Sequence, residues 1–433
     1  MKKISYQREI PEKYSADICI VGGGPAGVTA AVAAARQGCK VFLAEGAGCF
    51  GGAAVTALVP AFMPFDNGKD FLAGGLGREI YDRCEKTVFP PGGGMGIHPE
   101  KYKRLMDSLV CGEENITFSF FTSLIGVEQE DDRVSHCIFA AKSGLFAVSA
   151  KVFIDCTGDG DLCAWAGAPF ELGDSSGPPM PATLCSVWGD IDWNDKSFSD
   201  DEKLEQAIAD GVFTQEDRHL PGMWRTGEHQ GGGNIGHSFG VDATDEVSLT
   251  QAMLAGRRIL PEYERYYRKY LGRGYRNTSL AVTGSQLGIR ASRRIQGDYV
   301  MTGEDFHSRA RFADEIGVFS YPVDIHIANP SKEAYEEYHR KFVSMRYGPG
   351  EFYGIPYRSL LPKGLENVLV AGRCISTDKL MQSSVRVMPG CFITGQAAGV
   401  GAAVAVRSGT DPGQANIGEI RSVLGKMGAF LPG

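Results

Sequence analysis

The sequence predicts an α/β protein in which the first and last parts of the chain share one mostly parallel sheet, with an α+β domain inserted between them. Near the N-terminus, a β-branched run, a glycine-rich turn and an alanine-rich segment follow one another between residues 16 and 38. Strand-like runs that end in glycines recur near residues 155 and 370. Between those two runs the composition shifts to tryptophans, proline-rich loops and charged helices.

Length, composition and charge bound the class of protein. A chain of 433 residues is too long for one simple core, so two domains are expected. The hydrophobic fraction of 43% suits a packed globule. The net charge is −8 and no block of Lys or Arg occurs, which argues against a protein that follows nucleic-acid phosphates.

The cysteines and the N-terminus exclude further classes. None of the 11 cysteines forms a C-x-x-C pair, so zinc ribbons, iron–sulfur clusters and thioredoxin-like dithiols have no support, and we expect no metal. No apolar run precedes Ile18, so we expect no signal peptide. No uninterrupted apolar run is long enough to span a bilayer. We therefore expect a cytoplasmic protein without a membrane span.

The stretch ADICIVGGG predicts a buried parallel strand that ends in glycines. Gly22, Gly24 and Gly27 form G-x-G-x-x-G, and residues 26–37 predict an alanine-rich helix. The stretch CKVFLAE predicts a second strand, which ends at Glu45, 18 residues beyond Gly27 (45 − 27). That is close to the spacing of a carboxylate that binds the ribose of a dinucleotide.

Each part of this unit has a physical role in holding a nucleotide. Gly22 permits the tight turn, Gly24 lets the backbone approach a pyrophosphate, and Gly27 lets helix and strand pack closely. At the start of the predicted helix, beside Pro25 and Ala26, unpaired N–H groups and the positive end of the helix dipole attract the anion. The alternative is a glycine-rich turn in an ordinary βαβ unit. The full order of strand, glycines, helix, strand and acid favours the nucleotide site.

Four later segments are expected to complete the nucleotide site. They are the loop GAGCFGGAAVT, the strand and turn AKVFIDCTGDGDL, the strand LENVLVAGRCIS, and the helix MPGCFITGQAAGVGAAVAV from residue 390 to about residue 406. The cofactor contacts expected in them are Gly46, Gly51, Gly52, Thr157, Gly158, Asp159, Gly372, Arg373, Gly390 and Cys391. No second G-x-G-x-x-G follows a strand, so a separate NAD(P)H domain is not expected.

These motifs resemble the FAD-binding fold of the glutathione-reductase-like flavoproteins. More closely, nearly the whole chain resembles a bacterial family of FAD-dependent oxidoreductases. Its members carry G-x-G-x-x-G, a GG-x-x-x-T loop, an IDCTGDGDL-like turn and a LLVAGRCIS…RVMP.C…GQAAG ending. The resemblance implies a Rossmann-like, glutathione-reductase-like FAD-binding domain and FAD as the cofactor.

Two departures from the wider superfamily bear on how FAD is held. Fumarate-reductase-type proteins with a covalent flavin use a His in the loop after the second strand, and this loop has none. The resemblance therefore implies non-covalent FAD, with Cys49 as the alternative point of attachment. Many relatives place an Asp after the glycine of the late strand, where this chain has Arg373. Backbone groups or Asp378 would then hold the ribityl chain.

The domain boundaries follow from the composition and the motifs. Residues 1–165 and 357–433 are expected to form the discontinuous FAD-binding domain, with a β-meander at about 115–150. Residues 166–356 are expected to form the substrate domain. Within it, separate helices are predicted on either side of Pro261, and Thr302 with Asp305 predicts a capping box. The active site would lie between the domains, against the flavin.

A flavin enzyme needs few groups from the protein. The substrate C–H must be held over N5, a base accepts a proton, and cations orient the substrate. Of the three arginines Arg290, Arg293 and Arg294, we expect the first to reach the site. His326 follows a short strand and is the predicted general base. Arg386 stands just before the expected flavin helix. The structural alternatives are a buried, hydrogen-bonded role for His326 and a carboxylate partner for Arg386.

Three more histidines lie in a glycine-rich stretch: His219, His229 and His237. Their spacings of ten and eight do not match a helical metal motif, so we predict a substrate loop in which His237 is a second candidate for contact. The predicted activity is hydride transfer between a small alcohol or sugar-like substrate and flavin N5. The alternatives are fumarate-reductase-like reduction of a carboxylate-bearing double bond and a non-redox flavin-binding protein. The electron acceptor stays open, and a homo-oligomer is allowed.

Overall fold

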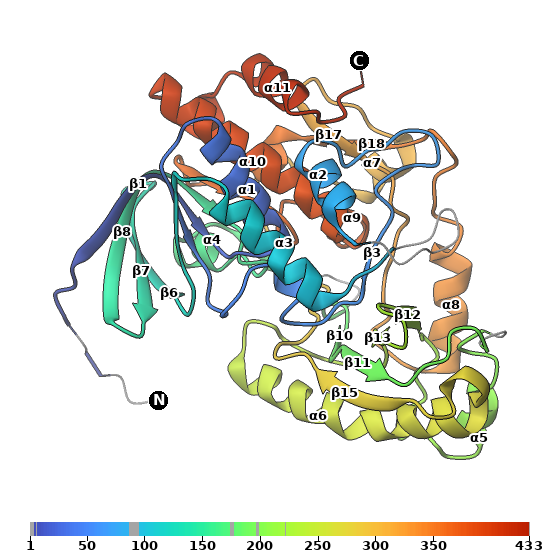
Figure 1. Cartoon of the computed structure of the whole chain (residues 1–433). Helices are drawn as coiled ribbons and strands as arrows, with labels where there is room; N and C mark the ends of the chain where they lie inside the picture. The colour runs from blue at the N-terminus through green and yellow to red at the C-terminus, as the bar shows by residue number, and fades with distance from the viewer. Residues whose placement is uncertain are drawn as a thin grey trace.

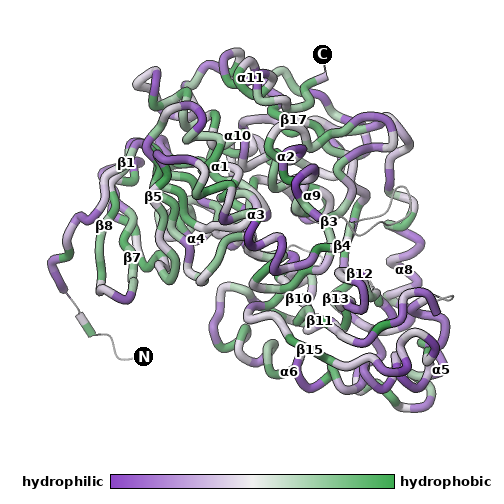
Figure 2. The backbone as a smooth tube through the Cα atoms, viewed as in Figure 1, coloured by the Kyte–Doolittle hydropathy of each residue, from purple (hydrophilic) through white to green (hydrophobic). Residues whose placement is uncertain are grey.

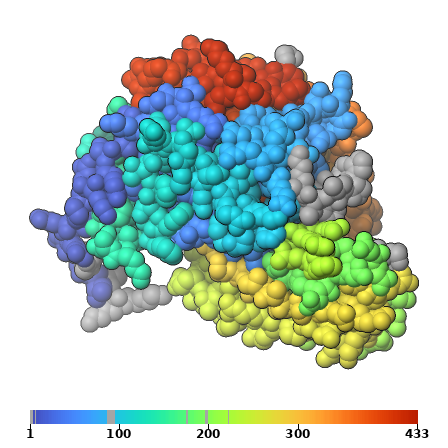
Figure 3. Space-filling view, viewed as in Figure 1, coloured from blue at the N-terminus to red at the C-terminus, as the bar shows by residue number. Residues whose placement is uncertain are grey.

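The computed structural model describes residues 4–432 except residues 6, 86–94, 174–176, 196–198 and 221. The chain forms a larger part, which contains both described ends of the chain, and a smaller part built from its middle (Figure 1). In the space-filling view the smaller part is a continuous lobe, green to yellow, against the underside of the larger one (Figure 3).

A seven-stranded sheet organises the larger part. The strand order is β5-β2-β1-β8-β7-β6, and β19 also pairs with β8. Strands β5, β2, β1, β8 and β19 run parallel, whereas β6 and β7 are antiparallel. The bounds are β1 (Glu12–Val21), β2 (Val41–Ala44), β5 (Ile116–Ser119), β6 (Ser123–Glu130), β7 (Arg133–Ala141), β8 (Gly144–Asp155) and β19 (Val368–Val370).

Strand β8 serves both halves of this sheet. Its first half, from Gly144 to Ser149, pairs with β7, and its last residues, from Phe153 to Asp155, pair with β19. The antiparallel meander therefore begins at β6, not at residue 115 as predicted. Strand β5 is a parallel partner of β2 instead. The reason is the helix α3 (Pro99–Cys111), because a strand that follows a helical crossover returns parallel to the strand before it.

Helices α1 (Pro25–Arg36) and α10 (Met388–Ser408) pack against each other in the larger part (Figure 1). Ten of the twelve residues of α1 are buried, as an alanine-rich core helix requires. The two backbones approach closely because Gly395 and Gly399 lack side chains. A Cβ built at either position would lie 2.2 Å from a carbonyl oxygen of α1.

Helix α10 also has the length and composition of a membrane span, contrary to the expectation that no such run exists. Its mean hydropathy over the most apolar window is 1.3, and 94% of that window is buried inside the protein. It is the one such helix among the residues that the structure describes. Its burial against α1 is that of a core helix.

The remaining elements of the larger part surround the sheet and the helix pair. The capping box predicted at Thr302 and Asp305 is confirmed at the start of α7. These elements are η1 (Gly52–Ala54), β3 (Ala61–Phe62), α2 (Leu76–Arg83), β4 (Met95–Gly96), α4 (Asp161–Trp165), β9 (Phe170–Leu172), β16 (Arg293–Ile295), α7 (Gly303–Ser308), β17 (Glu315–Phe319), β18 (Tyr353–Pro356), η4 (Tyr357–Leu360), α9 (Lys379–Val385), η5 (Pro412–Gln414) and α11 (Ile417–Lys426).

The smaller part has its own antiparallel sheet, β12-β13-β11-β15, with α6 along it. Hydrophobic segments gather in the large sheet and again around β11 (Figure 2). The elements are β10 (Ala182–Thr183), β11 (Ser186–Gly189), α5 (Leu204–Ala209), β12 (Met223–Arg225), β13 (Gly231–Gly233), β14 (His237–Ser238), α6 (Glu246–Arg265), η2 (Tyr266–Leu271), η3 (Arg273–Tyr275) and β15 (Ser279–Thr283). Helix α8 (Lys332–Phe342) follows later in the chain, and its Phe342 packs against the core of the larger part.

The apolar core of the smaller part is narrower than the predicted range of 166–356. Its buried members lie between Ala182 and Leu287, whereas buried residues from Ile295 to Ile355 join the core of the larger part. Helix α6 also continues through Pro261, where the sequence predicts a break. Arg257, whose carbonyl loses its partner to the proline, is exposed like Pro261 itself, so water can satisfy that carbonyl.

Candidate active site

A cavity of about 720 Å³ lies between the two parts, a volume typical of ligand sites. One end is lined by the glycine turn after β1, the end of β2, residues 156–159, residues 371–373 and the start of α10. The other end is lined by polar and apolar residues from 219 to 290 and from 321 to 326. The cavity therefore joins the predicted nucleotide site to the predicted substrate side.

Missing side chains shape the nucleotide end. Gly22 has φ +98°, and a Cβ there would lie 2.5 Å from the carbonyl oxygen of Cys156. A Cβ on Gly27 would lie 1.7 Å from the oxygen of Gly22, so this glycine serves helix–strand packing and does not line the cavity. Gly24 and Gly52 do line it, and a Cβ on Gly52 would reach 2.9 Å from the Cα of Gly24. Bare backbone is thus exposed at the start of α1, where Pro25 and Ala26 also line the cavity.

Glu45 is fixed by backbone donors at the end of β2. Gly23 N–H donates to its Oε2 at 2.6 Å and Ala47 N–H donates to its Oε1 at 2.7 Å. Burial raises the pKa of the Glu45 carboxyl, although these N–H groups oppose that shift. Gly46 lines the cavity beside it. Gly51 does not line the cavity; it has φ +106°, and its N–H donates to the Gly23 carbonyl at 2.9 Å.

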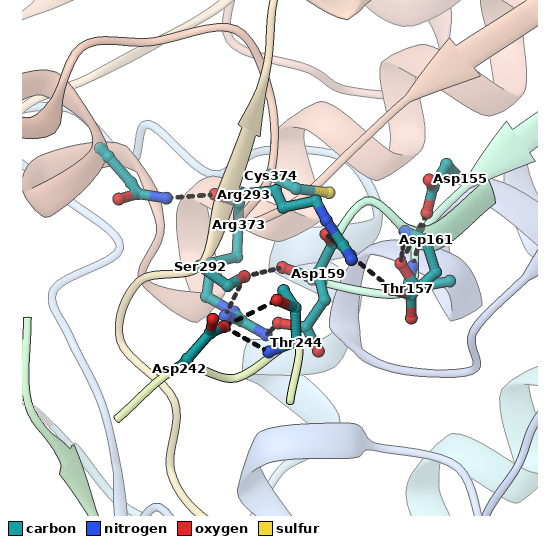
Figure 4. Close-up of polar contacts among 12 residues, drawn as sticks. Asp155, Thr157, Asp159, Asp161, Asp242, Thr244, Ser292, Arg293, Arg373 and Cys374 are labelled. Carbon is teal, nitrogen blue, oxygen red and sulfur yellow. Dashed lines mark hydrogen bonds and ion pairs between the residues drawn. The ribbon is translucent and has the colours of Figure 1, made fainter. Parts of the chain in front are cut away.

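Arg373 closes a polar network on the strand side of the cavity (Figure 4). Its Nη2 lies 2.8 Å from Asp159 Oδ1, and its Nη1 donates to Ser292 Oγ at 2.9 Å. Gly158 has φ +79°, and a Cβ there would lie 2.9 Å from the guanidinium. Thr157 also lines the cavity and donates its hydroxyl to the buried Asp155 at 2.8 Å. The arginine that replaces the expected aspartate is therefore held by a carboxylate of the preceding turn.

The start of α10 faces the cavity through Val387, Met388 and Cys391. Gly390 does not line the cavity. A Cβ at this position would lie 2.2 Å from the Val385 carbonyl oxygen. Its role is close packing of the turn that leads into the helix. Gly372, with φ +87°, does line the cavity.

Asp378 lies elsewhere. It caps α9, where its Oδ1 accepts from Met381 N–H at 2.7 Å, and its Oδ2 accepts from Gly303 N–H at 2.7 Å. It is not among the residues that line the cavity. Asp378 therefore does not stand in for the missing aspartate of the late strand.

At the other end of the cavity, two carboxylates and two imidazoles form a chain. Asp217 Oδ2 lies 2.7 Å from His237 Nδ1, and His237 Nε2 lies 2.8 Å from His326 Nδ1. His326 Nε2 lies 3.4 Å from Asp324 Oδ1. Asp217, His237 and His326 are buried, and His326 and Asp324 line the cavity.

The charges of this chain are set by burial and by one another. Burial alone would raise the pKa of the Asp217 carboxyl, but His237 outweighs it and the pKa lies below its ordinary value. The pKa of Asp324 is likewise low, because His326 and the charge of Arg386 together outweigh the effect of burial. Burial, and then the charge of Arg290, hold the pKa of His326 well below its ordinary value. Both carboxylates are therefore ionised and His326 is neutral at neutral pH.

With one N–H on each imidazole, this chain has room for one more proton. Its three contacts each need one hydrogen, whereas the two imidazoles then carry only two N–H hydrogens. With Asp217 ionised, the proton of His237 sits on Nδ1, so His237 Nε2 accepts from His326 Nδ1–H. The lone pair of His326 Nε2 then remains free. A proton taken up at that atom completes the third hydrogen bond, to Asp324.

All three predicted catalytic residues, His326, Arg290 and Arg386, line this end of the cavity. Arg386 Nη2 donates to the backbone oxygen and to Oδ2 of Asp324, at 3.0 and 3.1 Å. It thus has the carboxylate partner that was the structural alternative for it. Within the part of the chain that the structure describes, Arg290 donates only to neutral oxygens, which belong to Pro181, Thr183 and Asn234.

A family model described as FAD dependent oxidoreductase matches residues 17–424. The chain belongs to the FAD dependent oxidoreductase family. It is an enzyme, an FAD-dependent oxidoreductase, and its cofactor is FAD. The comparison with curated proteins gave no match.

Three of the solved structures similar to this oxidoreductase each have 12% identity to it. A geranylgeranyl bacteriochlorophyll reductase-like protein from Thermoplasma acidophilum has a TM-score of 0.47, over 96% of this chain and 82% of that one. A p-nitrophenol 4-monooxygenase from Pseudomonas putida has a TM-score of 0.46, over 96% and 84%. A triple mutant of the flavin-dependent brominase Bmp2 has a TM-score of 0.45, over 94% and 84%. Likeness at this level supports no inference about substrate.

The nucleotide end of the cavity fits the cofactor of this oxidoreductase. The glycine turn leaves bare backbone for a pyrophosphate, the start of α1 supplies N–H donors, and Glu45 has lone pairs left for ribose hydroxyls. The start of α10 presents a second helix N-terminus to the cavity, which suits the pyrimidine edge of the flavin. Cys49 is half-buried and does not line the cavity, in agreement with non-covalent FAD.

Sequence reasoning missed two residues at the substrate end of the oxidoreductase, and it named a third, His219, only as part of the predicted substrate loop. Asp217 and Asp324 anchor the two ends of the imidazole chain. His219 lines the cavity and stacks on His326, with ring centroids 4.2 Å apart and planes 5° apart. Its Nδ1 is buried and has no hydrogen-bond partner among the described residues. Burial, and then His237, lower the pKa of His219 to about 4, so the ring is neutral at neutral pH.

The only signal in the sequence was the run of histidines between positions 219 and 237, which we interpreted as a substrate loop. That stretch does contribute His219 and His237 to the site. Within the described ranges of the chain, no group of three or more His, Cys, Asp or Glu side chains is arranged to hold a metal ion.

Proposed function

We propose that this oxidoreductase transfers a hydride between a small polar substrate, an alcohol or sugar-like compound, and N5 of FAD. The observation that carries the proposal is the continuity of one cavity from the FAD end to the chain Asp217–His237–His326–Asp324. Oxidation of an alcohol releases a hydride and a proton together. FAD supplies the hydride acceptor, and the imidazole chain has one vacant place for the proton.

The residues divide the work by position. His326 Nε2 takes the hydroxyl proton, and the ionised Asp324 stabilises the imidazolium that results. Asp217 holds His237 with its proton on Nδ1, which fixes the tautomer of His326 in turn. His219 offers its unpartnered Nδ1 to a second polar group of the substrate. Asp217, His237 and His326 are themselves buried from bulk water.

A second candidate is the reduction of a carboxylate-bearing double bond, as in fumarate-reductase-like proteins. The charge of Arg290, which has no carboxylate partner among the described residues, favours it. His326, once protonated, would then donate the proton instead of accepting it.

The test is anaerobic reduction of the FAD-loaded enzyme against two panels, one of alcohols, polyols and hydroxy acids and one of enoates after chemical reduction. Bleaching of the flavin band by a member of the first panel supports the proposal. Reoxidation by an enoate alone would move the assignment to the second candidate. FAD that dithionite reduces but neither panel affects would refute both and leave a non-redox flavin-binding role.

We further infer a cytoplasmic protein of the glutathione-reductase-like branch, from a bacterium. Support comes from the motifs, from the parallel sheet with its meander, and from the burial of α10. We propose a small-molecule substrate and no nucleic-acid partner, because the net charge is −8 without a basic block. A homo-oligomer is allowed, which sedimentation would test.

A further inference from the structure

Three arginines line the cavity, and one of them lacks a counter-charge. Arg373 pairs with Asp159 and Arg386 pairs with Asp324. Arg290 is only 6% exposed, and no carboxylate of the described chain lies within ion-pair distance of it.

The guanidinium of Arg290 carries its charge at neutral pH. Burial, and then the like charge of Arg386, lower its pKa to about 10, which still leaves it protonated. A buried charge without a counter-ion is costly, and proteins normally pair it or hydrogen-bond it fully. The neutral oxygens around Arg290 supply part of that compensation only. An anion inside the cavity would supply the rest.

The donors left over on Arg290 have the geometry for a carboxylate. A guanidinium has five N–H donors. Nη1 donates to Pro181 O at 3.1 Å and to Thr183 Oγ1 at 2.7 Å, and Nη2 donates to Asn234 Oδ1 at 2.8 Å. Among the described residues, two donors of Arg290 have no partner, the Nε–H and one Nη2–H. Nε and Nη2 form one edge of the guanidinium, and an edge of this kind can bind both oxygens of a carboxylate.

The position of Arg290 assigns that anion to the substrate and not to FAD. All three of its partners lie between residues 181 and 234, in or beside the smaller part, so the guanidinium is fixed to the substrate side. The FAD phosphates have their own donors at the start of α1. Arg290 is also close enough to His326 for its charge to lower the pKa of that imidazole.

We propose that the substrate is a small organic acid whose carboxylate binds Arg290, with its reacting carbon and hydroxyl directed to His326 and His219. This rests on the proposed function and narrows its substrate class from neutral alcohols and sugars to hydroxy acids and other carboxylates. It has a further consequence. A bound carboxylate cancels the charge of Arg290, which makes His326 more basic, so binding is coupled to proton uptake.

The test is calorimetric titration of the full-length, FAD-loaded protein with glycolate and malonate, each against its amide, which removes the charge and replaces one acceptor oxygen with an NH2 donor. We expect the acids to bind with Kd on the order of 1 mM and the amides at least about tenfold more weakly. Binding of the acids should take up protons, which is measured in buffers of different ionisation heat. Equal affinity for acid and amide, or no binding of either acid, would overturn the proposal on the wild-type protein alone.

Variants then locate the charge. Arg290→Gln should weaken both acids by roughly 10- to 100-fold and abolish their advantage over the amides, and Arg290→Lys should keep part of it. Arg294→Gln is the matched control, because Arg294 is equally buried but pairs with Glu171 and does not line the cavity. A variant Arg290→Gln that binds the acids normally but lowers the flavin midpoint potential would assign the charge to FAD and refute the proposal.

Binding and turnover fail separately. If the acids bind through Arg290 and no hydroxy acid bleaches the flavin, the proposed hydride transfer is wrong and the carboxylate site stands. If a neutral polyol bleaches the flavin and neither acid binds, only the carboxylate site is refuted.

Discussion

The contact between α1 and α10 leaves no room for a methyl group, and this makes a quantitative prediction. In Gly399→Ala, the new Cβ would start 2.2 Å from the carbonyl oxygen of Ala30. Contact between such atoms needs about 3.5 Å, so the helices must separate by roughly 1 Å. Overpacking of this kind costs about 1–3 kcal/mol. We expect the free energy of unfolding to fall by that amount.

The assay is thermal unfolding of the FAD-loaded protein. The entropy of unfolding scales with chain length at roughly 2.1 cal/mol/K per residue, so for 433 residues this loss lowers Tm by about 1–3 °C. Gly425→Ala is the matched control, since this glycine is also helical and a Cβ there meets nothing within 4 Å. That control should be stabilised by up to about 1 kcal/mol, through helix propensity.

The neighbouring glycine sharpens the test. Gly395→Ala would place its Cβ 2.2 Å from the carbonyl oxygen of Ala26, in the same interface. Because one separation of the helices relieves both clashes, the double variant should lose less than the sum of the two single losses. If Gly399→Ala melts like Gly425→Ala, or if the two losses add fully, the reasoning from backbone contact is refuted.

Three further predictions concern the site. Glu45→Gln replaces one acceptor oxygen with a donor, so either Gly23 N–H or Ala47 N–H loses its partner, and FAD affinity measured by equilibrium dialysis should fall about tenfold; an unchanged affinity would contradict the assigned role. In Asp217→Asn the proton of His237 is no longer held on Nδ1, so kcat should fall by a factor of about 100 or more while the FAD content stays normal. The pKa of Asp217 is lower in the folded protein than its ordinary value of about 3.9, so its contribution to stability is present above that value and is lost as the pH falls through the folded value. The difference in Tm between wild type and Asp217→Asn should therefore narrow below about pH 4. A difference that widens in acid would count against the ion pair. Acid precipitation should release all FAD from the wild type and from Cys49→Ser alike, and flavin that stays in the wild-type pellet only would establish a covalent link.

Local spacing carried most of the correct inference about the nucleotide end. The strand, the three glycines, the helix and Glu45 follow one another within thirty-odd residues, so neighbouring residues along the chain determine their geometry. The helix near the C-terminus could likewise be predicted, from its run of small residues. Its partner was not, because nothing local states that Gly399 meets Ala30.

The substrate end depends on contacts between distant segments. His326 meets His237, 89 residues away, and neither position belongs to a motif. Single residues could therefore be nominated, as Arg290 and His326 were, whereas the chain they join could not. Asp217 and Asp324 lie in loops whose sequence gives no sign that they flank imidazoles. At Pro261 a local sequence rule gave the wrong answer. The rule that a proline ends a helix predicted a break there, but α6 continues because the position is exposed and tolerates a proline.

The sharing of β8 between β7 and β19 has a consequence for biosynthesis. Strand β19 lies at Val368–Val370 and α10 ends at Ser408, so the early strands and α1 leave the ribosome long before their packing partners exist. Until then the residues of α1 that the finished fold buries are exposed to solvent or to a chaperone. All buried core residues of the smaller part lie between residues 182 and 287, so this part can fold before β19 has been synthesised and the large sheet is complete. We therefore expect nascent chains stalled before β19 to hold a folded smaller part and a protease-sensitive remainder.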